Sequence, residues 1–204
     1  MKITIVILSL TVAILFGFNY SLNDVVASNQ IVNAGGNGTL WDSFTPKNVE
    51  VKVGESVTWR NPMMVSEPHT VTFIKDPSFF APPATPFSIP NMTELKSLSP
   101  PNQNIDPLTV DQNGSKAVIV DNARTYNPVA IDSTGNNVTY LPVNADYSMT
   151  GTEKFVNSGW MWPEGIAPPG SPPISNFTIT FEKSGSYDYI CAVHPWMSGS
   201  VKVS

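Results

Sequence analysis

The sequence predicts an all-β protein built as an antiparallel β-sandwich, and three observations support this fold class. Apolar and polar residues alternate in short segments at both ends of the chain, which is the pattern of strands with one buried face. Nineteen prolines and thirteen glycines imply many turns and irregular loops. The region between the two ends has no convincing helical period. Together these features favour two packed sheets joined by long loops.

Five strand-like segments make up the N-terminal part of the predicted sandwich. They are residues 30–33, 41–44, 49–53, 56–61 and 69–73. The turn at Gly54 joins the third and fourth of these segments, so we predict a hairpin there. In the fifth segment His69, Val71 and Phe73 share one face, which would place His69 at the edge of the core.

The C-terminal part repeats the pattern around a long central stretch. Its strand-like segments are residues 177–181, 187–191 and 200–203. The stretch 74–162 is rich in Pro, Asn and Ser, and we interpret it as a loop-rich insertion with a few added strands. At 204 residues, the chain is long enough for one domain with a core and too short for two comfortable ones.

The first 27 residues have the layout of an export signal. Lys2 precedes an apolar run from Ile3 to Phe18, and small residues end at Ala27. We expect either cleavage after Ala27 or retention of this segment as a membrane anchor, because the run is slightly shorter than the roughly 20 residues that span a bilayer. Either way, residues 28–204 would fold outside the cytoplasm, as a periplasmic, cell-surface or secreted domain.

The charge distribution excludes one class of partner. Only 13% of the residues are charged, the net charge is −5, and no basic cluster occurs. Phosphate binding needs concentrated Lys and Arg, so we do not expect nucleic acid as a partner.

The single cysteine, Cys191, needs an explanation in an exported protein. It could be a buried bystander, an intermolecular bridge, a nucleophile or a metal ligand. His194 follows three residues later and Met197 three residues beyond that, so one short loop presents a thiolate, an imidazole and a thioether. These are the ligand types of a trigonal copper site with a weak axial thioether. His69, which is the other of the two histidines, would supply the fourth ligand.

Each of these residues has a plainer interpretation when it is taken alone. A lone cysteine is more often a small core residue, a lone histidine a hydrogen-bonded structural residue, and a methionine core filler. A Cys–His nucleophile is also conceivable, although this spacing is not its usual layout. The convergence of all four residue types in one exported β protein favours the metal site.

The motif Cys191-x-x-His194-x-x-Met197, followed by Gly199 and a Val-x-Val strand, resembles the copper loop of the cupredoxins, the type 1 blue copper proteins. The plastocyanin, amicyanin and halocyanin types are the nearest variants, and Pro195 directly after the histidine is most similar to amicyanin. Upstream, residues 51–61 leading to 68–71 match the other part of the family's pattern. The resemblance covers roughly residues 45–73 and 174–204, and not most of the middle.

The resemblance implies a Greek-key fold, one Cu(I)/Cu(II) ion held by the four candidate ligands, and transfer of single electrons rather than catalysis. Many family members have Asn directly after the first histidine, where it ties the two ligand loops together. Thr70 stands at that position here, and its hydroxyl could make the same tie. Asn61, Thr70 and the backbone N–H groups of residues 191–197 are candidates for the groups that orient the ligands.

By the same resemblance, the edge of His194 would reach the surface and serve as the electron port. An apolar patch around it would dock a redox protein transiently; its candidate members are Pro195, Trp196, Pro68, Met63 and Met64. The two methionines could instead pack within their own loop.

Three functions therefore stay open at this point. The first is an extracytoplasmic electron carrier, and the second is a copper-binding or copper-delivery protein that uses Met63 and Met64 as soft Cu(I) ligands. The third is a surface β-sandwich that holds zinc or no metal. Copper oxidase or nitrite reductase activity is disfavoured, because further copper centres would need more than two histidines.

Overall fold

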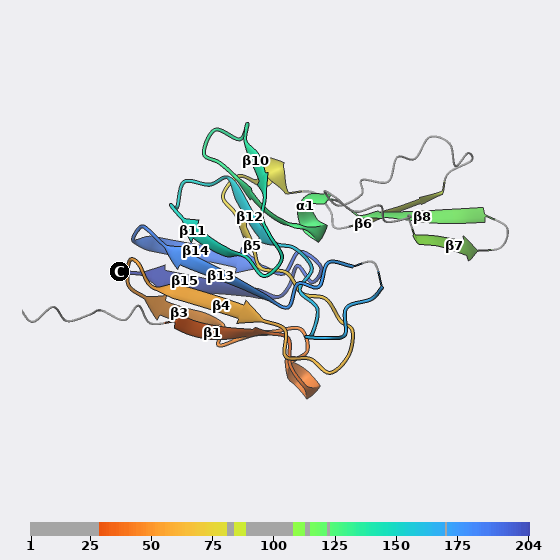
Figure 1. Cartoon of the computed structure of the whole chain (residues 1–204), viewed down its shortest axis with the longest axis horizontal. Helices are drawn as coiled ribbons and strands as arrows, with labels where there is room; N and C mark the ends of the chain where they lie inside the picture. The colour runs from red at the N-terminus through yellow and green to blue at the C-terminus, as the bar shows by residue number, and fades with distance from the viewer. Residues whose placement is uncertain (1–28, 81–83, 89–107, 113–114, 122, 170) are drawn as a thin grey trace, which may run out of the picture.

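The computed structural model describes residues 29–80, 84–88, 108–112, 115–121, 123–169 and 171–204. The predicted export signal or anchor over residues 1–27 lies outside these ranges. Within them the chain forms two main β-sheets packed face to face and a smaller third sheet (Figure 1). The all-β prediction is therefore confirmed. No helix in the described ranges has the length and apolar character needed to cross a membrane.

The first main sheet has the order β11-β13-β4-β1-β2 among the described residues. Its strands are β1 (Asn29–Ala34), β2 (Phe44–Thr45), β4 (Ser56–Arg60), β11 (Asp146–Met149) and β13 (Asn176–Phe181). In the central strand β4, Val57 and Trp59 face the core and are fully buried. Thr58, which points to the other face, bonds to the hydroxyl of Thr178 on β13 at 2.7 Å. This alternation is the reason the segment folds as a half-buried strand.

The second main sheet has the order β10-β9-β12-β5-β14-β15-β3 in the described part of the chain. Its strands are β3 (Asn48–Val51), β5 (Thr72–Ile74), β9 (Pro128–Ile131), β10 (Val138–Tyr140), β12 (Phe155–Ser158), β14 (Gly185–Ile190) and β15 (Ser198–Val203). The first residue of β5, Thr72, pairs with the last residue of β14, Ile190. Because this pair is antiparallel, the segment before β5 and the segment after β14 lie side by side at one end of the sandwich.

The central stretch 74–162 contributes strands to both main sheets. β9, β10 and β12 extend the second sheet, and β11 extends the first. The third sheet, formed by β6 (Ala84–Ser88), β8 (Ser115–Asp121) and β7 (Leu108–Gln112), extends away from the other two (Figure 1). The short helices of the described chain are η1 (Gly38–Leu40), η2 (Pro77–Phe79) and α1 (Ala123–Tyr126).

Two predictions about strand pairing are wrong. β3 and β4 do not form a hairpin, because the chain crosses from one sheet to the other at Gly54, where φ is +85°. Both strands bury their apolar residues in the same core from opposite sides, so alternation identifies the buried face but not the partner strand. The sheets are also mixed rather than antiparallel, since the pairs β1–β4, β15–β3 and β11–β13 are parallel.

An aromatic cluster fills the core between the two main sheets. The ring of Tyr189 lies 5.2 Å from that of Trp59, 5.5 Å from that of Phe73 and 4.8 Å from that of Phe44, measured between centroids. Edge-on and tilted contacts at these distances are favourable for aromatic rings. Cys191 belongs to the same buried cluster. The packed core therefore continues to the end of the sandwich where the candidate ligands lie.

Gly159 provides a test of how tightly the central stretch is packed into the sandwich. It has φ of +72°, and an added Cβ would lie 2.8 Å from backbone atoms of residues 126–128. Gly165 has a similar φ of +76° but nothing within 4 Å of an added Cβ. Gly165→Ala should lower the free energy of unfolding by about 1–2 kcal/mol, because only the left-handed conformation is unfavourable for alanine there. Gly159→Ala should cost about 1–3 kcal/mol more in the free energy of unfolding, because backbone must move. Equal losses in denaturant unfolding would contradict this packing.

Candidate metal centre

Two chain segments carry the candidate ligands to one end of the sandwich, the end away from the C-terminus (Figure 1). His69 precedes β5 and pairs with Met161 through two backbone hydrogen bonds of 3.0 and 2.7 Å. Cys191 directly follows β14. The antiparallel pairing of β5 with β14 therefore brings together two residues that are 122 positions apart in the sequence.

Three ligand atoms converge there. Cys191 Sγ lies 3.6 Å from Nδ1 of His194 and 3.9 Å from Nδ1 of His69. The three residues are buried, and their ligand atoms all lie within 4.8 Å of one another. Across the residues that the structure describes, no other group of three or more His, Cys, Asp or Glu side chains is close enough to hold a metal.

The donor set fits a small metal ion. Metal bonds of about 2.0–2.3 Å to nitrogen and sulfur, at angles near 110–120°, place ligand atoms about 3.5–3.8 Å apart. Of the two sulfur–nitrogen distances, 3.6 Å lies within this range and 3.9 Å lies just above it. A thiolate with two imidazoles is a soft set that suits copper or zinc, and not magnesium or calcium.

The loop from Cys191 to Met197 is closed by its own backbone. The N–H of Cys191 donates to the carbonyl of Met197 at 2.9 Å, and the N–H of Met197 donates to the carbonyl of His194 at 2.8 Å. This tight turn sets the spacing between the thiol and the imidazole. Met197, the fourth predicted ligand, is buried in the same core cluster as Cys191.

Thr70 joins the two ligand segments. Its N–H donates to Cys191 Sγ at 3.3 Å, and its hydroxyl oxygen accepts from the N–H of Ala192 at 2.6 Å. The same hydroxyl lies 2.9 Å from that of Thr72, which donates to the side-chain carbonyl of Asn157 at 2.8 Å. Since every member of this buried chain has a partner, the network is rigid rather than costly. Thr70 thus ties the two ligand segments together, as expected from the resemblance in which Asn holds this position in many family members.

Burial controls the protonation of the donors. It lowers the pKa of His69 to about 4, with the neighbouring His194 acting in the same direction and Asp42 opposing them. Burial also raises the pKa of the Cys191 thiol, against the lowering effect of the Thr70 N–H. In the metal-free protein His69 is therefore a neutral imidazole and Cys191 a thiol. Metal binding must displace the thiol proton, which makes affinity rise with pH.

His194 is more enclosed than the predicted electron port would be, with 7% of its surface exposed. Its Nε2 lies 3.0 Å from Oε1 of Glu67, and the rings of Trp41 and Trp196 approach it edge-on at 5.6 and 5.4 Å. Trp196 is 64% exposed, and its indole N–H donates to Asp42 at 2.8 Å. The aromatic surface at this end of the molecule therefore comes chiefly from the two indoles.

Only part of the predicted docking patch lies on the surface. Met64, Pro195 and Trp196 are exposed, and Pro68 is half-buried. Met63 differs from the prediction, because it is buried with its Sδ 3.1 Å from Nε2 of His69.

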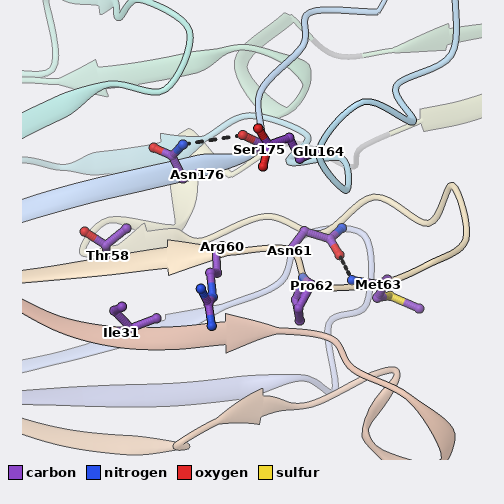
Figure 2. Close-up of a pocket in the computed structure, with 9 residues that line it drawn as sticks. All are labelled: Ile31, Thr58, Arg60, Asn61, Pro62, Met63, Glu164, Ser175 and Asn176. Carbon is purple, nitrogen blue, oxygen red and sulfur yellow. Dashed lines mark hydrogen bonds between the residues drawn. The ribbon is translucent and has the colours of Figure 1, made fainter.

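The hydrogen bonds of the Asn61 side chain do not reach a donor atom; they hold the loop that precedes His69. Its side chain accepts from the N–H of Met63 at 3.1 Å and donates to the carbonyls of Glu67 and Met161 at 2.8 and 2.9 Å. Figure 2 shows Asn61 and Met63 at the end of β4, on the wall of an open groove of about 620 Å³. None of the three donors lines that groove.

Three residues around the donors were not predicted from the sequence. Glu67 and Trp41 contact His194, and Gly35 lies against His69. An added Cβ at Gly35 would lie 2.5 Å from Nε2 of His69 and 2.8 Å from Sδ of Met63. The glycine-rich turn after the first strand carried a signal for this close approach, whereas nothing in the sequence distinguished Glu67 or Trp41 from other surface residues.

The comparisons with known proteins give amicyanins among the similar solved structures. A mutant amicyanin in its Cu(I) form is 15% identical over 89% of this chain and 87% of that chain, with a TM-score of 0.38. Amicyanin from Paracoccus versutus is 19% identical over 89% and 86%, also with a TM-score of 0.38. No family model and no curated protein matches the chain. The case for the metal centre therefore rests on the donor geometry.

Substitution of Thr70 tests the tie between the ligand segments. Thr70→Val keeps the shape but leaves the buried N–H of Ala192 without an acceptor. We expect the metal-free protein to lose about 1–3 kcal/mol in the free energy of unfolding, measured with denaturant. Thr70→Ser keeps the hydroxyl and should lose clearly less. Equal losses in the two variants would show that the hydroxyl is not the tie.

Proposed function

We propose that this chain is a blue-copper electron carrier that works outside the cytoplasm and holds one copper ion. His69, Cys191 and His194 would bind it, with Met197 as a weak axial ligand. The observation that carries the proposal is the convergence of one thiol and two imidazole Nδ1 atoms at metal-ligand spacing in a buried site. The export-like N-terminal segment supports the location.

The residues of the chain would perform three tasks. Thr70 and the 191–197 loop hold the donors in position, so a change of metal charge requires little rearrangement. The apolar core behind Cys191 keeps water away from the sulfur. When bound, copper supplies one-electron exchange between Cu(I) and Cu(II). The third task is the orientation of the imidazoles, which their outer contacts would set.

A redox protein would dock transiently at the end of the sandwich that carries His194. Trp41, Trp196 and Met64 offer exposed apolar surface there. Such a surface suits a brief encounter, because apolar contact binds without fixing many polar groups in place. Since the indoles of Trp41 and Trp196 touch the imidazole, they are the parts of the chain that a partner would reach first.

The alternative of copper delivery has less support in the geometry. That function would use Met63 and Met64 together as accessible Cu(I) ligands. Met64 is exposed, but Met63 is buried against His69, so the two sulfur atoms do not form one accessible pair. A structural zinc site would fit the same donors and is separated from the proposal by spectroscopy.

Titration of the purified protein with Cu(II) tests the proposal. A Cu(II)–thiolate bond should give an intense blue colour that a reductant bleaches and an oxidant restores. Cys191→Ser should abolish the colour, whereas Met64→Leu, at an exposed position outside the donor set, should keep it. A colourless protein that takes up zinc in preference, or no metal, would rule out the electron carrier.

A further inference from the structure

We propose that Glu67 is a positioning residue that fixes the ring of His194 and biases the site toward its oxidised state. The inference rests on the proposed function, because the bias concerns a bound copper ion. Its structural part, the choice of the protonated ring nitrogen, concerns the chain alone and can be tested without metal.

The contact between the two residues assigns the proton. Oε1 of Glu67 lies 3.0 Å from Nε2 of His194. A carboxylate oxygen can only accept, so this 3.0 Å contact favours hydrogen on Nε2 over a lone pair there. The lone pair of a neutral imidazole is then on Nδ1, which is the atom that lies 3.6 Å from Cys191 Sγ. Glu67 thereby presents the correct nitrogen to the metal site before any metal arrives.

The position of Glu67 is built into its loop. Asn61 donates from its side-chain nitrogen to the backbone carbonyl of Glu67 at 2.8 Å and to that of Met161 at 2.9 Å. Met161 is paired through its backbone with His69. The loop that carries the carboxylate is therefore tied to the same strand end that carries the other imidazole. This arrangement explains why Asn61 is buried although its side chain is hydrogen-bonded to none of the three candidate metal ligands.

The other imidazole has an uncharged partner. Nε2 of His69 faces Sδ of Met63 at 3.1 Å, and the N–H of Met63 is held by the Asn61 side chain. One loop thus covers the outer nitrogen of both imidazoles, with a thioether on the buried ring and a carboxylate on the ring nearer the surface. The Glu67 carboxylate acts on the donor set through His194, whereas the Asp42 carboxylate acts on His69 through space.

A carboxylate in this place has a predictable effect on the redox balance. Its negative charge lies against the His194 ring and would stabilise the more positive oxidation state of a bound copper ion. The Glu67 side chain is 36% exposed, so solvent screens part of this effect. We expect loss of the charge to shift the Cu(I)/Cu(II) preference about tenfold toward Cu(I), which corresponds to about 59 mV for one electron.

The first experiment examines the metal-free protein. Ring-nitrogen NMR at neutral pH should show His194 with hydrogen on Nε2 in the unmodified chain. Glu67→Gln keeps an oxygen that can accept and should preserve this form, whereas Glu67→Ala should mix the two forms. An unchanged His194 signal in Glu67→Ala would overturn the proposal. This result stands whether or not the protein binds copper.

The second experiment measures the reduction potential of the copper-loaded variants by voltammetry. Glu67→Gln and Glu67→Ala should both raise the potential. Glu164→Gln is the matched control, because it removes the same charge from the neighbouring loop that lines the groove in Figure 2 without an observed contact to either imidazole. Equal shifts in Glu67→Gln and Glu164→Gln would overturn the redox part. Failure of the unmodified protein to take up copper would instead refute the proposed function, and the NMR result would still decide the role of Glu67.

Discussion

The pairing of β5 with β14 is the contact on which the rest of the site depends. It brings the segments that hold His69 and Cys191 to the same edge, and Thr70 then fixes their separation by bonding to both the sulfur and the N–H of Ala192. The short 191–197 loop adds His194 at a distance set by its own backbone. Strand pairing therefore sets the position, and two local hydrogen-bond networks set the spacing.

This arrangement places polar groups at the edge of an apolar core, where an unpaired group is costly. The chain meets that cost by giving each group a partner: Thr70 is bonded through Thr72 to Asn157, and the outer nitrogens of the imidazoles face Met63 and Glu67. Burial nevertheless keeps His69 neutral and the cysteine a thiol. The resulting site is ordered without metal and gains a charged thiolate only when a cation replaces the proton.

The sequence predicted those features that local pattern determines. Alternation located most strands, and the three-residue spacings after Cys191 showed that one loop carries several ligand types. The strand partners were not predictable in the same way: β3 and β4 alternate like a hairpin but lie in different sheets, since alternation is identical for either pairing. Glu67 and Trp41 were missed because their contacts with His194 arise only when distant segments meet. Gly35 is an intermediate case. The glycine-rich turn was visible in the sequence, but its close approach to His69 and Met63 is seen only in the structure.

Thr70 and the 191–197 loop hold the three donors in place in the metal-free chain. Crystal structures of the metal-free and copper-loaded protein, with anomalous scattering at the copper edge, would show whether copper binds to this preformed set. We expect one copper peak bonded to Cys191 Sγ and to Nδ1 of His69 and His194, with the Thr70–Ala192 hydrogen bond unchanged between the two structures. A peak at another position, or a 191–197 loop that refolds when copper binds, would contradict this expectation.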